Sequence, residues 1–176
     1  MAGATATANR SAAKSVLARA GTTVEWLLGL VLIGIVLLNV ANATGRYLFS
    51  SAINGADEAM VFVMIFLVMA GAVLALARRS HIGIDLLPSW LGGRRLTLLY
   101  ALHDLVALCA TGFAAWASWH FVSRLSRLGT KSMMLGIPMT IPHAMLLLGF
   151  GGMAAISLVL LVRGLWRLST RSGDAP

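Results

Sequence analysis

Four long runs of residues without a charged side chain follow one another along the chain, separated by shorter polar connections. They cover residues 26–45, 59–77, 105–123 and 132–162, which are 20, 19, 19 and 31 residues long. An α-helix rises about 1.5 Å per residue and the hydrocarbon core of a bilayer is about 30 Å thick, so roughly 20 apolar residues cross it. Four such runs within 176 residues predict an all-α integral membrane protein with four transmembrane helices.

The same pattern divides the chain into three parts. Residues 1–21 form a basic N-terminal tail, either solvated or lying on the membrane as an interfacial helix, and residues 169–176 form a C-terminal tail. Between them, residues 22–168 form the membrane domain, with helices predicted at about 23–44, 58–77, 95–121 and 142–167. Residues 80–93 are too apolar for a solvated loop, and Trp90 suits the headgroup level, so we predict a short interfacial segment there.

The charges indicate how the helices are oriented. Only 11% of the residues are charged, whereas soluble domains carry about 25%. The net charge of +8 lies in the connections, so we interpret it as a topology signal and expect no nucleic-acid partner. Ten basic residues fall in the two tails and the middle connection, against four in the other connections: Arg46, Arg124, Arg127 and Lys131. The positive-inside rule therefore predicts that both termini are cytoplasmic, although three of the four remaining cations then face outward together.

Some polar and small residues inside the runs are candidates for packing against protein. Asn39 and Asn42 lie three apart on one face of the first helix, and an amide within lipid needs a hydrogen-bonding partner. Gly151 and Ala155 form a small-xxx-small pair on the fourth helix, which allows a close approach of another helix. We expect all four residues to meet protein, either within this subunit or in a partner.

A cluster of charges is predicted where the first two helices meet. Arg46 lies near the end of the first helix, and Asp57 and Glu58 begin the second. A cation suits the C-terminus of a helix and acids suit the N-terminus, and the short connection brings these ends together. We therefore expect Arg46 to pair with one of the two carboxylates.

Residues that could carry chemistry are few. The sequence has no nucleophile–base pair, phosphate-binding glycine loop or metal-ligand cluster, so we do not expect an enzyme. A haem would need His103 opposite His81, or His120 opposite His143, and a partnered histidine is the simpler interpretation. Asp104 is either a pore or proton-relay residue or a partnered charge near the interface. The first helix has no carboxylate in its middle, which argues against a small proton-coupled exporter.

The residues at the helix junctions occur in an order that resembles a known family. The relevant strings are Gly45-Arg46-Tyr47-Leu48-Phe49, Asp57-Glu58, Arg79-Ser80-His81-Ile82-Gly83-Ile84-Asp85, Arg94, and Lys131-Ser132-Met133-Met134-Leu135-Gly136-Ile137-Pro138 followed by Pro142 and Leu148-Gly149. Over roughly residues 24–165 this order and spacing resembles the small membrane subunit, DctQ type, of tripartite ATP-independent periplasmic (TRAP) transporters. His81 and Asp85 become candidate interface residues because they belong to the string that begins at Arg79 and lie in the connection that is too apolar for a solvated loop.

The resemblance implies a bacterial inner-membrane protein that works with partners. A large permease subunit of the DctM type would carry the substrate and sodium sites, and a periplasmic binding protein would deliver a carboxylate substrate. This chain would brace the large subunit and would itself hold no cofactor. The alternative is the membrane anchor subunit of a respiratory enzyme complex, with or without haem.

Overall fold

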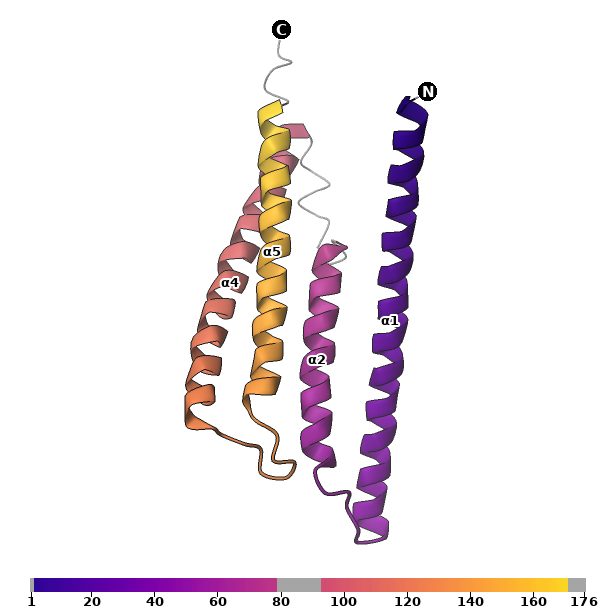
Figure 1. Ribbon diagram of the computed structural model, residues 1–176, viewed down its shortest axis with the longest axis vertical. Helices are drawn as coiled ribbons and strands as arrows, with labels where there is room; N and C mark the ends of the chain where they lie inside the picture. Colours follow the sequence, from indigo (N-terminus) through magenta and orange to yellow (C-terminus); the bar gives the residue numbers. More distant parts are fainter. Residues whose placement is uncertain (1, 79–92, 171–176) are drawn as a thin grey trace. The chain divides into compact units, whose positions relative to one another are not determined.

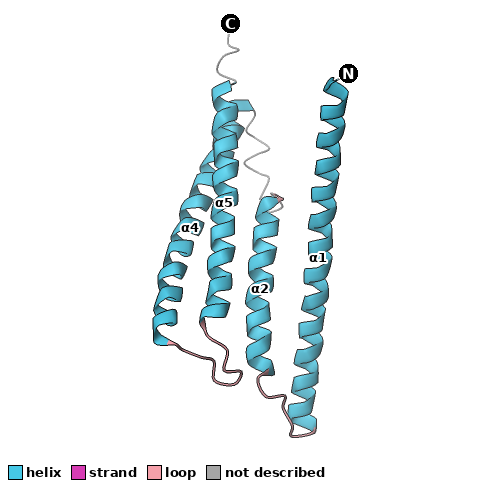
Figure 2. Ribbon diagram, viewed as in Figure 1, coloured by secondary structure: helices cyan, strands magenta, loops and turns pink. Residues whose placement is uncertain are grey.

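The computed structural model describes the backbone of residues 2–78 and 93–170 and the side chains of residues 21–78 and 95–166. Its helices are α1 (Ala2–Leu48), α2 (Ala56–Ala77), α4 (Gly93–Leu128) and α5 (Thr140–Thr170) (Figure 1). Figure 2 shows that every regular element in this part of the chain is a helix. Each helix contains a segment long and apolar enough to cross a membrane, which confirms the predicted all-α class with four spans.

The chain separates into two compact units, residues 1–67 and residues 68–176, and the boundary falls inside α2. The first unit contains α1 and the first part of α2. The second contains the rest of α2 together with α4 and α5. The predicted interfacial segment at residues 80–93, with candidate residues His81 and Asp85, lies almost wholly outside the described residues, which resume at Gly93.

Helix α1 is much longer than the predicted span. It has 47 residues, and at about 1.5 Å each it is roughly 70 Å long, more than twice the thickness of the hydrocarbon core. The backbone of the predicted N-terminal tail continues the membrane helix instead of forming a separate element. No proline interrupts residues 2–48, so the ladder of backbone hydrogen bonds has no missing donor.

The turn that ends α1 depends on a glycine. The backbone N–H groups of Phe49 and Ser51 both donate to the carbonyl of Gly45, at 3.1 and 3.0 Å. A side chain at position 45 would put its Cβ 2.7 Å from the carbonyl oxygen of Ser51, so only glycine allows this return of the chain. Ser50 adopts a left-handed conformation with φ of 50° to complete the turn.

In the second unit, α5 packs against both α4 and α2. Phe121 of α4 meets His143 near the start of α5, and Ala101 meets Gly164 near its end, so α4 and α5 are antiparallel neighbours. Gly149 and Gly152 of α5 also lie close to Met69 and Val73 in the second part of α2. Helix α4 continues about two turns beyond the predicted end at residue 121, because the residues after the apolar run remain helical although they are charged.

The connection between α4 and α5 is a small hairpin. Met139 donates its backbone N–H to the carbonyl of Thr130 at 2.9 Å, and Ser132 donates to Ile137 at 2.8 Å. The Ser132 hydroxyl also accepts the N–H of Ile137 at 3.3 Å, and this serine is buried. Gly136 takes a positive φ of 65° at the turn, a conformation that glycine adopts without steric penalty.

Candidate functional site

The junction of α1 and α2 holds a connected polar cluster, which we call the hairpin cluster: Asn42, Arg46, Asp57 and the backbone N–H of Ile53. Arg46 donates from Nη2 to Oδ2 of Asp57 at 2.7 Å. Asn42 donates from Nδ2 to Oδ1 of the same carboxylate at 3.0 Å and accepts the N–H of Ile53 at 2.9 Å. Asp57 therefore accepts one hydrogen bond from the charged Arg46 and one from Asn42, one turn earlier on α1.

The buried member of this cluster is Asn42. Asn42 as a whole residue is only 2% exposed, whereas the side chains of Arg46 and Asp57 are 48% and 67% exposed. An exposed ion pair contributes about 0.2–1 kcal/mol, while a hydrogen bond to a charged group contributes about 1.5–3 kcal/mol. The predicted pairing of Arg46 with a carboxylate is present, and Asn42 adds two further hydrogen bonds that join α1 to the start of α2 and to the connection before it. Because Asn42 is shielded from water, we expect it to contribute more to stability than the exposed ion pair.

Glu58 follows Asp57 in the first turn of α2 and is partly buried. Of the two acids, Asp57 is the one that the Arg46 guanidinium contacts. Two acids in the first turn stabilise α2 electrostatically, because the unpaired N–H groups at the start of a helix carry partial positive charge.

The two asparagines of α1 have different surroundings. Asn42 meets protein within its own unit, whereas Asn39, one turn earlier, is exposed. Among the described residues Asn39 has no hydrogen-bonding partner, although it lies within the candidate span Gly21–Leu48. Its predicted contact with protein remains a prediction, now directed at a partner chain.

The close approach between α5 and α2 occurs at glycines next to the predicted pair. A Cβ at Gly149 would lie 2.6 Å from the sulfur of Met69, and one at Gly152 would lie 3.4 Å from Val73. By contrast, nothing lies within 4 Å of a Cβ built at Gly151, and Ala155 is exposed. Gly151 and Ala155 therefore remain predictions for a contact outside the described chain.

Besides Ser132 in the hairpin, two polar residues are buried in the described part of the second unit. Asp104 is 5% exposed and lies beside His103, with Oδ1 3.9 Å from the ring nitrogen Nδ1. Ser157 on α5 is fully buried, and its hydroxyl has no hydrogen-bonding partner among the described residues. Both interpretations of Asp104, a partnered charge near the interface and a pore or proton-relay residue, remain predictions.

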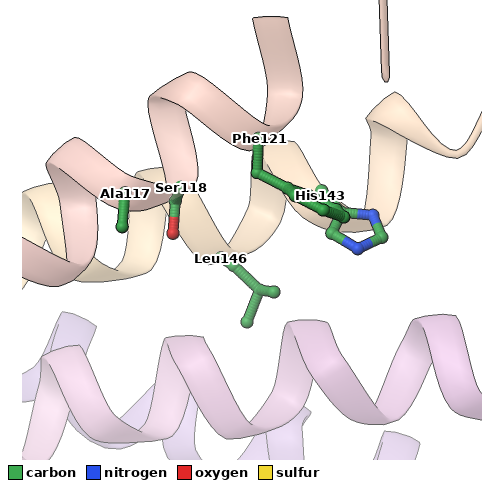
Figure 3. Close-up of a pocket in the computed structure, with 5 residues that line it drawn as sticks. All are labelled: Ala117, Ser118, Phe121, His143 and Leu146. Atoms are coloured by element: carbon green, nitrogen blue, oxygen red, sulfur yellow. The ribbon is translucent and has the colours of Figure 1, made fainter. Parts of the chain in front are cut away.

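The histidines near one end of α4 and α5 pack against aromatic rings. His120 stacks edge-on to Trp116 at 4.6 Å, and His143 lies 4.8 Å from Phe121 between ring centroids. His143 donates from Nδ1 to the carbonyl of Met139 at 2.7 Å. Phe121 and His143 line a pocket of about 290 Å³ together with Ala117, Ser118 and Leu146. Figure 3 shows these five side chains. Among the described residues no group of three His, Cys, Asp or Glu side chains could hold a metal ion.

Comparison with known proteins gives two findings. The family described as "Tripartite ATP-independent periplasmic transporters, DctQ component" matches residues 20–167. A relative from Vibrio cholerae serotype O1, the "C4-dicarboxylate TRAP transporter small permease protein DctQ", is 34% identical over 102 residues. That match covers 54% of this chain and 43% of the relative, so the chain spans less than half the length of this relative.

Proposed function

Since the chain belongs to the DctQ component family of tripartite ATP-independent periplasmic transporters, we propose that it braces the large permease subunit of a sodium-coupled importer. It is a multi-pass inner-membrane protein and a transporter component, not an enzyme. Its substrate is an organic acid delivered by a periplasmic binding protein, and the relative's name favours a C4-dicarboxylate. Family membership does not favour the alternative of a respiratory anchor subunit.

The observation that carries this proposal is the unsatisfied surface of α1. In the span Gly21–Leu48, none of the most apolar window is buried. Lipid can cover the apolar side chains of this helix, but it offers no partner to the exposed amide of Asn39. Transfer of a polar group into an apolar medium without a hydrogen bond costs about 1–3 kcal/mol of free energy, as judged from protein mutations. A large membrane partner that bonds to Asn39 would remove this penalty.

We place the substrate and sodium sites in the large subunit. A sodium site needs several oxygen ligands that converge, and the described acids of this chain are already engaged. Asp57 is bonded to Arg46 and Asn42, and Asp104 lies against His103. The small subunit then acts by holding the stationary part of the transporter in place.

Orientation forms part of the proposal. Both termini and the connection between α2 and α4 would be cytoplasmic, because ten of the fourteen basic residues fall on that side. The hairpin cluster and the connection between α4 and α5 would then face the periplasm, where the binding protein approaches.

Reconstitution tests the proposal directly. Liposomes that contain this chain alone should show no sodium-driven uptake of succinate, fumarate or malate. Addition of the large subunit and the binding protein should produce uptake. Robust uptake by the isolated chain would overturn the accessory role, and Asp104 would then be the first residue to replace.

Association with the partner can be measured separately. Asn39→Leu should weaken co-purification of the large subunit, while the matched change Val36→Leu, one turn earlier on the same exposed helix, should leave it intact. Equal recovery of the large subunit with both variants would contradict a role for Asn39 in this contact.

A further inference from the structure

Three cations in the last turns of α4 and at the start of the following hairpin have no role in the proposed function. Arg124, Arg127 and Lys131 are all exposed. The sequence contains no acid between Asp104 and Asp174, so neither the α4–α5 hairpin nor α5 up to its last described residue supplies a carboxylate. Asp104 itself lies roughly 30 Å back along α4, at about 1.5 Å per residue. The negative charge that balances these cations must therefore come from outside the described part of this unit.

The hairpin beside these cations presents apolar side chains outward. Met133, Met134 and Leu135 at its tip are 98%, 70% and 39% exposed. The base is held by the backbone bonds between Thr130 and Met139 and between Ser132 and Ile137. The tip is thus a fixed apolar projection, and contact with water is unfavourable for its side chains.

The position of the hairpin along the helices matches the surface of the membrane. The candidate span of α5 begins at Thr140, immediately after the hairpin. Trp116 and Trp119, both 59% exposed, lie on α4 a few turns before its end, and tryptophans of this kind collect at membrane–water interfaces. Because the ring of Phe121 on α4 packs on that of His143 on α5, both helices reach the membrane–water interface near the hairpin.

We propose that the α4–α5 hairpin is a phospholipid-binding anchor. Met133 and Met134 enter the boundary between headgroups and acyl chains, and Arg124, Arg127 and Lys131 bind lipid phosphates. The surface of a phospholipid membrane can accommodate apolar side chains next to cations, since it offers hydrocarbon and negative charge within a few ångströms of each other. This binding also accounts for three cations on the side of the membrane that the positive-inside rule disfavours. It does not depend on the proposed partner.

The depth of the tip can be measured in the full-length chain without any partner. A spin label at Met133→Cys, in a Cys109→Ser background, is placed in nanodiscs that contain phosphatidylglycerol. The label should collide more often with oxygen, which dissolves in lipid, than with a water-soluble nickel chelate. A label at Leu148→Cys, on the exposed face of the same unit's α5, provides the reference for the membrane interior. A second label at Leu135→Cys leaves both methionines in place.

The outcomes separate lipid from protein as the occupant. More frequent collision with the nickel chelate at both tip positions would overturn the proposal. Protection that appears only when the large subunit is added would also overturn it, and would assign the tip to a protein contact. Arg127→Gln combined with Lys131→Gln should move the tip label toward water, while Arg163→Gln, at the other end of α5, should not. An unchanged depth in the double variant would overturn the assignment of these cations to phosphate.

Discussion

Replacement of Asn42 by alanine removes two hydrogen bonds that join α1 to the start of α2. The carboxylate of Asp57 loses a donor at 3.0 Å, and the N–H of Ile53 loses its acceptor at 2.9 Å. A net hydrogen bond contributes about 0.5–1.5 kcal/mol, and about 1.5–3 kcal/mol when one partner is charged. Because the side chain of Asp57 is 67% exposed, water can replace part of the lost bond, and we expect a total loss of about 1–3 kcal/mol.

The assay is reversible unfolding of the isolated chain in mixed micelles, followed by far-UV circular dichroism. Asn42→Ala should lower the free energy of unfolding more than Arg46→Ala, for which the exposed ion pair predicts about 0.2–1 kcal/mol. Asn39→Ala is the matched control, because it removes an amide of the same helix that has no partner among the described residues. A double-mutant cycle between Asn42 and Asp57 isolates their coupling.

The reasoning fails if Asn42→Ala and Asn39→Ala are equally stable. It also fails if the Asn42–Asp57 cycle shows no coupling while Asn42→Ala remains destabilising, because the loss would then come from packing. Asp57→Asn is informative here, since it keeps an oxygen that can accept from Asn42 but removes the charge that faces Arg46.

Three further predictions concern the rest of the chain. Arg46→Ala should lower the melting temperature of the subunit more than Arg10→Ala, since Arg46 is paired with Asp57 in the hairpin cluster; equal melting temperatures would count against that role. Gly149→Leu should destabilise the isolated chain, because the new side chain would collide with that of Met69. Gly151→Leu should leave thermal unfolding of the isolated chain nearly unchanged and should instead reduce its association with the large subunit. The opposite order of the two glycine variants in thermal unfolding would refute the assigned seam. Reporter fusions should be periplasmic in the first and third connections and cytoplasmic in the second, and a reversal at any site would refute the orientation; the fusion points are residues 52, 129 and 92.

The four spans follow from the sequence alone because they depend on a local property. A run of about 20 apolar residues can only cross the bilayer as a helix, whatever its neighbours are. The pairing of Arg46 with an acid was also predictable, since a short connection and two helix dipoles determine which charges meet. Sequence patterns placed the end of the third helix too early, because the charges after residue 121 end the apolar run without ending the helix.

Tertiary structure decided which of several equivalent residues make contacts. Asn39 and Asn42 have the same side chain and lie one turn apart, yet only Asn42 meets the start of α2. Gly149 and Gly152 face α2, whereas the neighbouring Gly151 has no side chain near its position. Composition and spacing define the faces of a helix, but the rotation of that helix about its own axis is set by how side chains of different helices fit together. That fit is a property of the packed chain, so the sequence predicted the helices and the structure selected the residues that join them.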